Sequence, residues 1–191
     1  MLQGLICCAG IGCCVAMSMP QVHIVAYATD LGHAAQRGAE LLSVMLGGGV
    51  ISRMLSGWIS DRIGGLRTML LGSALQALSL VLFLGADTLV MLYVVSAIFG
   101  LSQGGIVPSY AIIVRTFFPA SQAGWRIGLS IMFTIFGMAF GGWMAGALYD
   151  LTGAYVVSFL NGIAFNVLNL MIGLTLLYRA GRPGRVIPAA A

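Results

Sequence analysis

Charge is the property that this sequence has least of. Only 7% of its 191 residues are charged, and the nine basic residues are all arginines, against five acidic residues. Hydrophobic residues make up 60% of the chain, and the mean hydropathy is +1.02. A soluble domain of this length does not need so many apolar residues to form its core. The composition therefore excludes that class and indicates an integral membrane protein.

Catalytic motifs are also missing. The sequence has no HExxH motif and no serine–histidine–acid set, and the GGGV run at 47–50 lacks the lysine of a phosphate-binding loop. The basic surplus does not indicate nucleic-acid binding, because most of the arginines lie in connectors on one side of the predicted membrane bundle. We expect no enzymatic activity, no cofactor and no nucleic-acid partner.

Cysteine is scarce and confined to one stretch, with Cys7, Cys8, Cys13 and Cys14 as its four members. Cys7 and Cys14 are two helical turns apart, about 10 Å, which is too far for one tetrahedral metal site. Adjacent cysteines on a helix also point about 100° apart. We interpret the four as small residues in a packed membrane helix and predict no metal site.

Long apolar runs, by contrast, fill the chain. Six segments are each long enough to cross about 30 Å of hydrocarbon. They run over 2–28, 39–60, 67–86, 88–114, 127–149 and 155–178. The first begins at the N-terminus without the basic segment or the cleavage site of a secretory signal. The sequence thus predicts an all-α membrane protein with six transmembrane helices and a tail at 179–191.

The arginines predict how these helices are oriented. Two connectors and the tail hold Arg62, Arg67, Arg115, Arg126, Arg179, Arg182 and Arg185. The connectors on the other side hold Arg37 alone, with most of the acidic residues. The positive-inside rule then places the first group, and with it both chain ends, in the cytoplasm. We expect an inner (plasma) membrane protein.

The chain also repeats itself. The pattern Gly-x-x-x-Asp-x-x-Gly at 57–64 recurs at 146–153, and the same offset carries Pro20 close to Pro108. Three helices per unit mean that the second unit enters the membrane from the opposite side. This predicts a 3+3 inverted repeat, which is common in secondary transporters, with proline-interrupted helices marking the transport pathway. The units are about 1–86 and 88–178.

The stretch from Gly47 to Arg67 is the one around which the chain is organised. Gly49, Arg53 and Gly57 are spaced by four residues and so share one helical face. Arg53 lies eight residues before Asp61, about 12 Å of helix axis inside the membrane edge. A lone arginine at that depth costs about 2.5–3.5 kcal/mol on insertion scales. We therefore expect Arg53 to face a protein interior or a watery cavity.

The run GWISDRIGGLR at 57–67 resembles the loop signature of the major facilitator superfamily. The matching positions are Gly57, Asp61, Arg62, Gly64 and Arg67, and the sequence departs at Gly65, where the signature usually has a basic residue. With VHIVAYATDLG at 22–32, it is similar to bacterial members of the monocarboxylate-porter branch and their oxalate/formate relatives. The resemblance covers the whole chain, as the C-terminal half of a twelve-helix fold. It implies secondary transport of a small organic anion by alternating access.

The resemblance also implies roles for particular residues. Arg53 matches the arginine with which monocarboxylate carriers hold a substrate carboxylate. Gly49 stands where the animal carriers have an aspartate for proton coupling, so coupling to a proton would need another group, such as His23 or a residue of the other half. Two alternatives stay open: another facilitator substrate, such as a drug or metabolite, or a membrane or assembly subunit that does not transport.

Four more polar residues are candidates for substrate binding. His23 lies seven residues before Asp30, about 10 Å inside the outer edge, and its ordinary pKa suits proton transfer. Tyr27 shares its face, and Gln103 and Tyr110 flank Pro108 on the fourth span. In the superfamily the first and fourth spans of each half line the cavity. Each of these residues also suits a role as a hydrogen-bonding packing residue.

Other motifs predict structural roles. Asp61 and Arg62, with Gly57, Gly64 and Arg67, form the loop signature, which we interpret as a gate whose charge pairs rearrange during transport. The stripe Gly137, Gly141 and Ala145 predicts close helix packing. Asn161, Asn166 and Asn169 predict packing hydrogen bonds.

The last expectation concerns partners. In the family fold the cavity lies between two six-helix halves, and each half supplies one wall. Besides the lipid bilayer, we therefore expect a missing N-terminal half or a second copy of this chain as the partner. The chain alone is not expected to transport.

Overall fold

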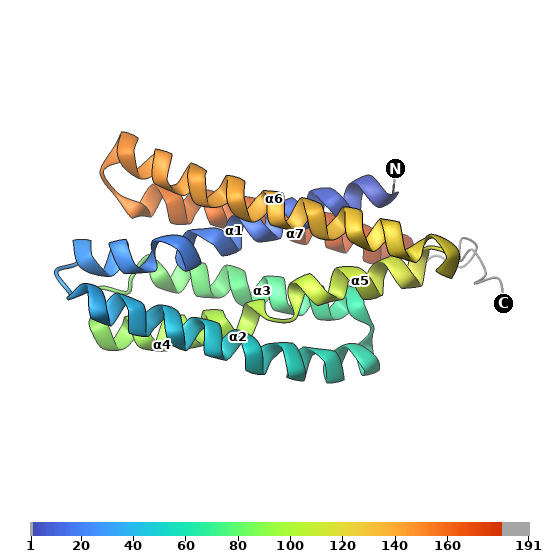
Figure 1. Ribbon diagram of the computed structural model, residues 1–191, viewed down its shortest axis with the longest axis horizontal. Helices are drawn as coiled ribbons and strands as arrows, with labels where there is room; N and C mark the ends of the chain where they lie inside the picture. The colour runs from blue at the N-terminus through green and yellow to red at the C-terminus, as the bar shows by residue number, and fades with distance from the viewer. Residues whose placement is uncertain (1, 181–191) are drawn as a thin grey trace.

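The computed structural model describes residues 2–180, in which helices are joined by short connectors and no strand occurs (Figure 1). Its helices are α1 (Leu2–Asp30), α2 (Ala35–Ile63), α3 (Gly65–Phe83), α4 (Leu89–Gln103), α5 (Ile106–Phe117), α6 (Ala120–Thr152) and α7 (Tyr155–Ala180). Because α4 and α5 form one span, the described residues contain six spans that are long and apolar enough to cross a membrane. The predicted class and number of spans are confirmed. Residues 181–191, including Arg182 and Arg185, lie outside the described residues.

The charged residues separate to the two ends of the bundle. The start of α1, the end of α7 and the turns α2–α3 and α5–α6 lie at one end, to the right in Figure 1. This end carries Arg62, Arg67, Arg115, Arg126 and Arg179. The other end carries Asp30, Arg37, Glu40, Asp87 and Asp150. The arrangement is the one that the orientation prediction requires, and the orientation itself stays a prediction.

The two glycines that end the repeated motif both have a positive φ, although their ψ values differ, at 153° for Gly64 and 12° for Gly153. Gly64, between α2 and α3, has φ +86°, and Gly153, at the end of α6, has φ +68°. In both, the backbone N–H donates to the carbonyl four residues earlier, at 2.9 Å to Ser60 and at 2.7 Å to Tyr149. Positive φ is the region where glycine is favoured, which explains why glycine stands at both positions.

Helix contacts follow the predicted repeat. α1 packs against α6 and α7, and the α4–α5 span packs in the same way against α2 and α3. At the end opposite the termini, Tyr149 of α6 donates to Asp30 of α1 at 2.5 Å, and Tyr93 of α4 donates to Glu40 of α2. Exchanging the two units leaves the pairing of the helices the same, as an inverted repeat requires. The two hydrogen bonds both lie at one end and are not exchanged with each other.

The glycine stripe on α6 is a helix contact, as predicted. A Cβ added to Gly137 would lie 2.8 Å from the Cα of Ile11, and one on Gly141 would lie 2.7 Å from the Cα of Val15. Only glycine allows α1 and α6 to approach so closely. Ala145 is buried, and its carbonyl accepts a hydrogen bond from Ser158 of α7.

The fourth span differs from its prediction as one continuous helix over 88–114. The helix is interrupted at Gly104 and Gly105, between α4 and α5 (Figure 1). Pro108 lies four residues after Gly104, lacks an N–H and carries a ring that clashes with the carbonyl of residue i−4. The interruption therefore falls where the proline acts. α1, by contrast, runs without interruption through Pro20, so the predicted matching interruptions occur only in the fourth span.

Candidate functional site: a pocket around Arg53

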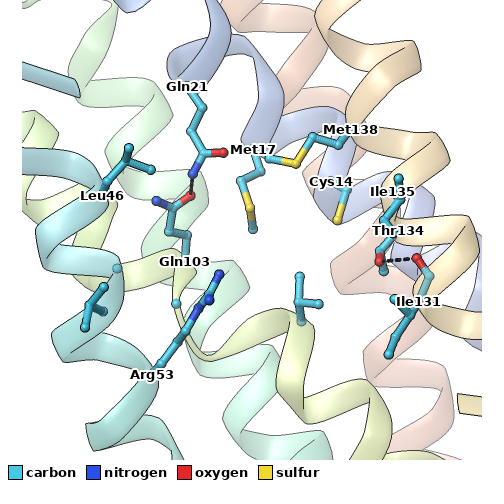
Figure 2. A pocket seen from close by; sticks show the side chains of 14 residues that line it. Cys14, Met17, Gln21, Leu46, Arg53, Gln103, Ile131, Thr134, Ile135 and Met138 are labelled. Carbon is cyan, nitrogen blue, oxygen red and sulfur yellow. Dashed lines mark hydrogen bonds between the residues drawn. The ribbon is translucent and has the colours of Figure 1, made fainter. Parts of the chain in front are cut away.

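A pocket of about 380 Å³ opens among α1, α2, the α4–α5 break and α6. Figure 2 shows its lining side chains. Most of the lining is apolar. Its polar side chains are Cys14, Gln21, Arg53, Gln103 and Thr134, and no carboxylate among the described residues lines it. The pocket therefore carries one positive charge and no negative one.

Arg53 extends from α2 into this pocket, toward Gln103 (Figure 2). Its side chain is exposed, and within residues 2–180 its guanidinium has no hydrogen bond, ion pair or ring contact. An uncompensated arginine inside a membrane bundle is expected to face a cavity. The expectation that Arg53 faces a cavity is confirmed, and the guanidinium is free to bind an anion.

The close approach of α2 and α4 holds Arg53 in place. A Cβ on Gly104 would overlap the carbonyl of Gly49 and lie 3.0 Å from the backbone nitrogen of Arg53. Ser52, the residue before Arg53, donates a hydrogen bond from its hydroxyl to the carbonyl of Leu101 on α4 at 2.5 Å. The turn of α2 that carries Arg53 is thus packed directly on the break in the fourth span.

The break also frees a backbone acceptor beside Arg53. In a regular helix the carbonyl of Gly104 would accept from the N–H of residue 108, and Pro108 has none. Gly104 itself lines the pocket. Pro108 therefore leaves the carbonyl of Gly104 without its usual helical partner, and Gly104 lines the same pocket as Arg53.

An amide pair joins the two repeat units above Arg53. Gln21 Nε2 of α1 donates to Gln103 Oε1 of α4 at 2.6 Å, and both side chains line the pocket (Figure 2). An amide has two donors and one acceptor oxygen. Among the described residues, the pair therefore retains Gln21 Oε1 as an unpaired acceptor and the Gln103 NH₂ as an unpaired donor.

Of the five predicted substrate-binding residues, the structure brings Arg53 and Gln103 to the pocket. It places His23, Tyr27 and Tyr110 elsewhere. His23 Nε2 lies 2.9 Å from the carbonyl of Gly142, and its ring packs 5.8 Å from that of Tyr155.

The two tyrosines have backbone or amide partners of their own. Tyr27 donates to the carbonyl of Phe83 at 3.4 Å and packs edge-to-face on Tyr155. Tyr110 is buried and donates to Asn169 Oδ1 at 3.1 Å, and Asn169 Nδ2 donates to Ser73 at 2.7 Å. The packing role predicted for Asn169 is confirmed, whereas the hydrogen bond predicted for Asn166 is not found, because its buried amide has no partner among the described residues.

Gln21 is the pocket residue that sequence reasoning missed. Cys14, Met17 and Gln21 are spaced by three and four residues, so they form one helical stripe, and it is this stripe of α1 that lines the pocket. His23 and Tyr27 lie on another face, toward α7 and α6. The spacing from Gln21 was visible in the sequence, but nothing there indicated which face of α1 the pocket occupies.

The loop signature lies at the arginine-rich end, away from the pocket. Arg62 stacks on Trp58, with its guanidinium carbon 3.7 Å from the ring centroid. Asp61 and Arg67 are exposed, and a Cβ on Gly57 would meet nothing within 4 Å. The one ion pair among the described residues, Arg37–Glu40 at 2.8 Å, is at the opposite end. The gating role of the signature stays a prediction.

Comparisons with known proteins agree with these features. The family model described as "Major Facilitator Superfamily" matches residues 4–190. "Monocarboxylate transporter 13" of Rattus norvegicus is 32% identical over 149 residues, which are 77% of this chain and 35% of the rat protein. "Probable anion transporter 2, chloroplastic" of Oryza sativa subsp. japonica is 29% identical over 112 residues, 58% of this chain and 21% of that protein. The chain spans about a third of the length of its monocarboxylate-transporter relatives.

Proposed function

Because this chain belongs to the Major Facilitator Superfamily, we propose that it serves in secondary transport of a small organic anion, a monocarboxylate, by alternating access. The observation that carries the proposal is the free guanidinium of Arg53 in a pocket without a carboxylate. Two kinds of relative add support, since their names are those of monocarboxylate and anion transporters.

The chemistry of Arg53 suits a carboxylate. Its planar fork presents two parallel N–H donors to two carboxylate oxygens, which a lysine ammonium cannot do. A hydrogen bond to a charged group contributes about 1.5–3 kcal/mol. The largely apolar lining favours an anion with a small organic body. We propose that the Gln21–Gln103 pair binds a second polar group on that body.

The residues that line this pocket also matter for proton coupling. Gly49 lines it where the animal carriers have an aspartate, and His23 lies outside it, bonded to Gly142. We propose that any proton coupling uses a group outside this wall of the pocket.

A second wall is part of the proposal. In the most apolar stretch of each helix, 67% of the residues of α1 are buried, against 17% in α2 and 28% in α6. Two of the helices that border the pocket, α2 and α6, are therefore largely uncovered. We propose that another six-helix body, either an N-terminal half or a second copy of this chain, completes the transport unit.

Substitution of Arg53 tests the anion site. The assay uses proteoliposomes that contain this chain together with the six-helix body that completes the transport unit. There, Arg53→Gln should abolish carboxylate uptake. Arg53→Lys should raise KM, because a point charge replaces the fork. Arg126→Gln is the matched control, since Arg126 lies at the end of the bundle, bonded to Gln122. Equal amounts of inserted protein are confirmed by quantitative immunoblotting. Unchanged uptake in Arg53→Gln would remove Arg53 from the site and the carboxylate assignment with it.

A further inference from the structure

Three sulfur-bearing side chains line the pocket, separate from Arg53 and the amide pair. They are Cys14 and Met17 of α1 and Met138 of α6. Figure 2 shows their sulfur atoms on the side of the pocket nearest α1 and α6, with Arg53 on the other side. We call these three residues the sulfur cluster. The proposed anion site has no use for them, because sulfur is a poor partner for a carboxylate.

Helix packing brings the cluster together. Cys14 and Met17 are three residues apart on α1 and so share one face. On α6, a Cβ on Gly137 would lie 3.3 Å from the Cβ of Cys14, so α6 packs closely on α1 at this level. Met138, the next residue, lines the pocket from the α6 side. The Sγ atoms of Cys13 and Cys14 are 3.5 Å apart, so a second thiol adjoins the cluster.

The donor set is selective for a soft metal ion. Thiolate and thioether sulfur are soft ligands, which favour Cu(I). The residues described by the structure contain no group of three or more His, Cys, Asp or Glu side chains that could hold a metal. Hard cations such as Mg²⁺ and Ca²⁺ prefer oxygen ligands, and Zn²⁺ in structural sites is four-coordinate with thiolate and imidazole. Neither set is present here.

The net charge of the metal complex also favours Cu(I). A thiol must lose its proton to bind a metal, and that proton leaves to the solvent. One thiolate, two neutral thioethers and Cu(I) together carry no net charge. A neutral complex avoids the cost of placing a charge in an apolar pocket inside the membrane, whereas a divalent ion on the same ligands would keep one positive charge close to Arg53.

We propose that Cys14, Met17 and Met138 form a binding site for a soft monovalent metal ion, Cu(I). The prediction from cysteine spacing alone excluded such a site. It considered four cysteines as the only ligands, and two of the three ligands proposed here are methionines.

The test is a binding titration of the purified 191-residue chain in detergent with Cu(I), kept reduced and presented by a competing chromophoric chelator. We expect one high-affinity ion per chain. Even outer-shell partners of a metal are worth roughly 10–100-fold in affinity. Met17→Leu and Met138→Leu should therefore each weaken binding by roughly tenfold or more, and Cys14→Ser should abolish it.

Matched controls lie on the same two helices. Cys8 on α1 and Met132 on α6 are exposed and do not line the pocket, so Cys8→Ser and Met132→Leu should leave the affinity unchanged. The two pocket methionine-to-leucine changes conserve volume and keep the fold. They therefore test the Cu(I) site even if Cys14→Ser is unstable. The proposal is overturned if both bind Cu(I) like the parent chain, or if the controls lose as much affinity as the pocket variants.

Discussion

The first and fourth spans occupy equivalent places in the two repeat units, yet their helices respond differently to proline. α1 contains Pro20 and is continuous from Leu2 to Asp30, whereas the fourth span is interrupted at Gly104 and Gly105, upstream of Pro108. Both spans are well buried, and each contributes one glutamine to the pocket. The difference therefore does not come from burial or from the presence of a proline.

The residue four positions before each proline accounts for the difference. The proline ring pushes against the carbonyl of that residue, which is Ala16 in α1 and Gly104 in the fourth span. Gly104 is followed by a second glycine, and both stay in the right-handed region, with φ/ψ of −60°/−27° and −90°/−12°. Both glycines are also packed on α2, at Gly49 and Ser56, which leaves no room for a side chain. A proline removes one helical hydrogen bond, and the residues around it determine whether the helix is interrupted there.

The largest effect in this comparison is expected from Gly104→Ala. The new methyl group would overlap the carbonyl of Gly49 and lie 2.7 Å from the Cβ of Ser52. Overpacking of this kind costs about 1–3 kcal/mol of unfolding free energy. Gly57→Ala is the control, because its Cβ meets nothing within 4 Å, and it should be neutral or stabilising. Thermal unfolding of the purified chain in detergent measures both, and equal melting temperatures would contradict the close packing of α2 on the break.

A smaller effect is expected from Pro108→Ala. The new N–H can donate to the carbonyl of Gly104, which contributes about 0.5–1.5 kcal/mol and closes the interruption. Hydrogen exchange of the backbone amides between 104 and 109 should slow. Pro20→Ala should change exchange in α1 less, because that helix is already continuous. A larger change in α1 than in the fourth span would reverse our account of the two prolines.

The smallest effect is expected at the amide pair that joins the two spans. Gln21→Leu and Gln103→Leu each remove the 2.6 Å hydrogen bond. A double-mutant cycle in thermal or denaturant unfolding should give a coupling energy of about 0.5 kcal/mol, because both amides face a pocket where water can replace the lost partner. A coupling energy of zero would mean that the two amides do not bind each other in solution.

Local features of the sequence led to much of the fold and to part of the site. Six apolar runs indicated six spans, because the bilayer thickness sets their length. The glycine spacing on α6 indicated a close helix contact, and the depth of Arg53 indicated a cavity or a protein interior. These predictions depend on properties that a residue has by itself or with neighbours one turn away.

The other site residues could not be assigned in this way. His23, Tyr27 and Tyr110 had suitable chemistry and depth, but their helical faces meet neighbouring helices. Gln21 and Met138 had no signal of their own and became pocket residues because α1, α4 and α6 meet around them. Polarity shows that a residue needs a partner, and it does not show whether that partner is a substrate or another helix.

The sequence by itself determined the membrane class, the number of spans, the separation of charge between the two ends and the depth of Arg53. Each of these follows from hydrophobicity and helical rise along the chain. Only the tertiary structure decided that the fourth span opens at Gly104, that Gln21 pairs with Gln103, and that Cys14, Met17 and Met138 line one pocket with Arg53. The physical reason is that helices far apart in the sequence pack by the shape of their surfaces, and small changes in that shape rotate which residues face one another.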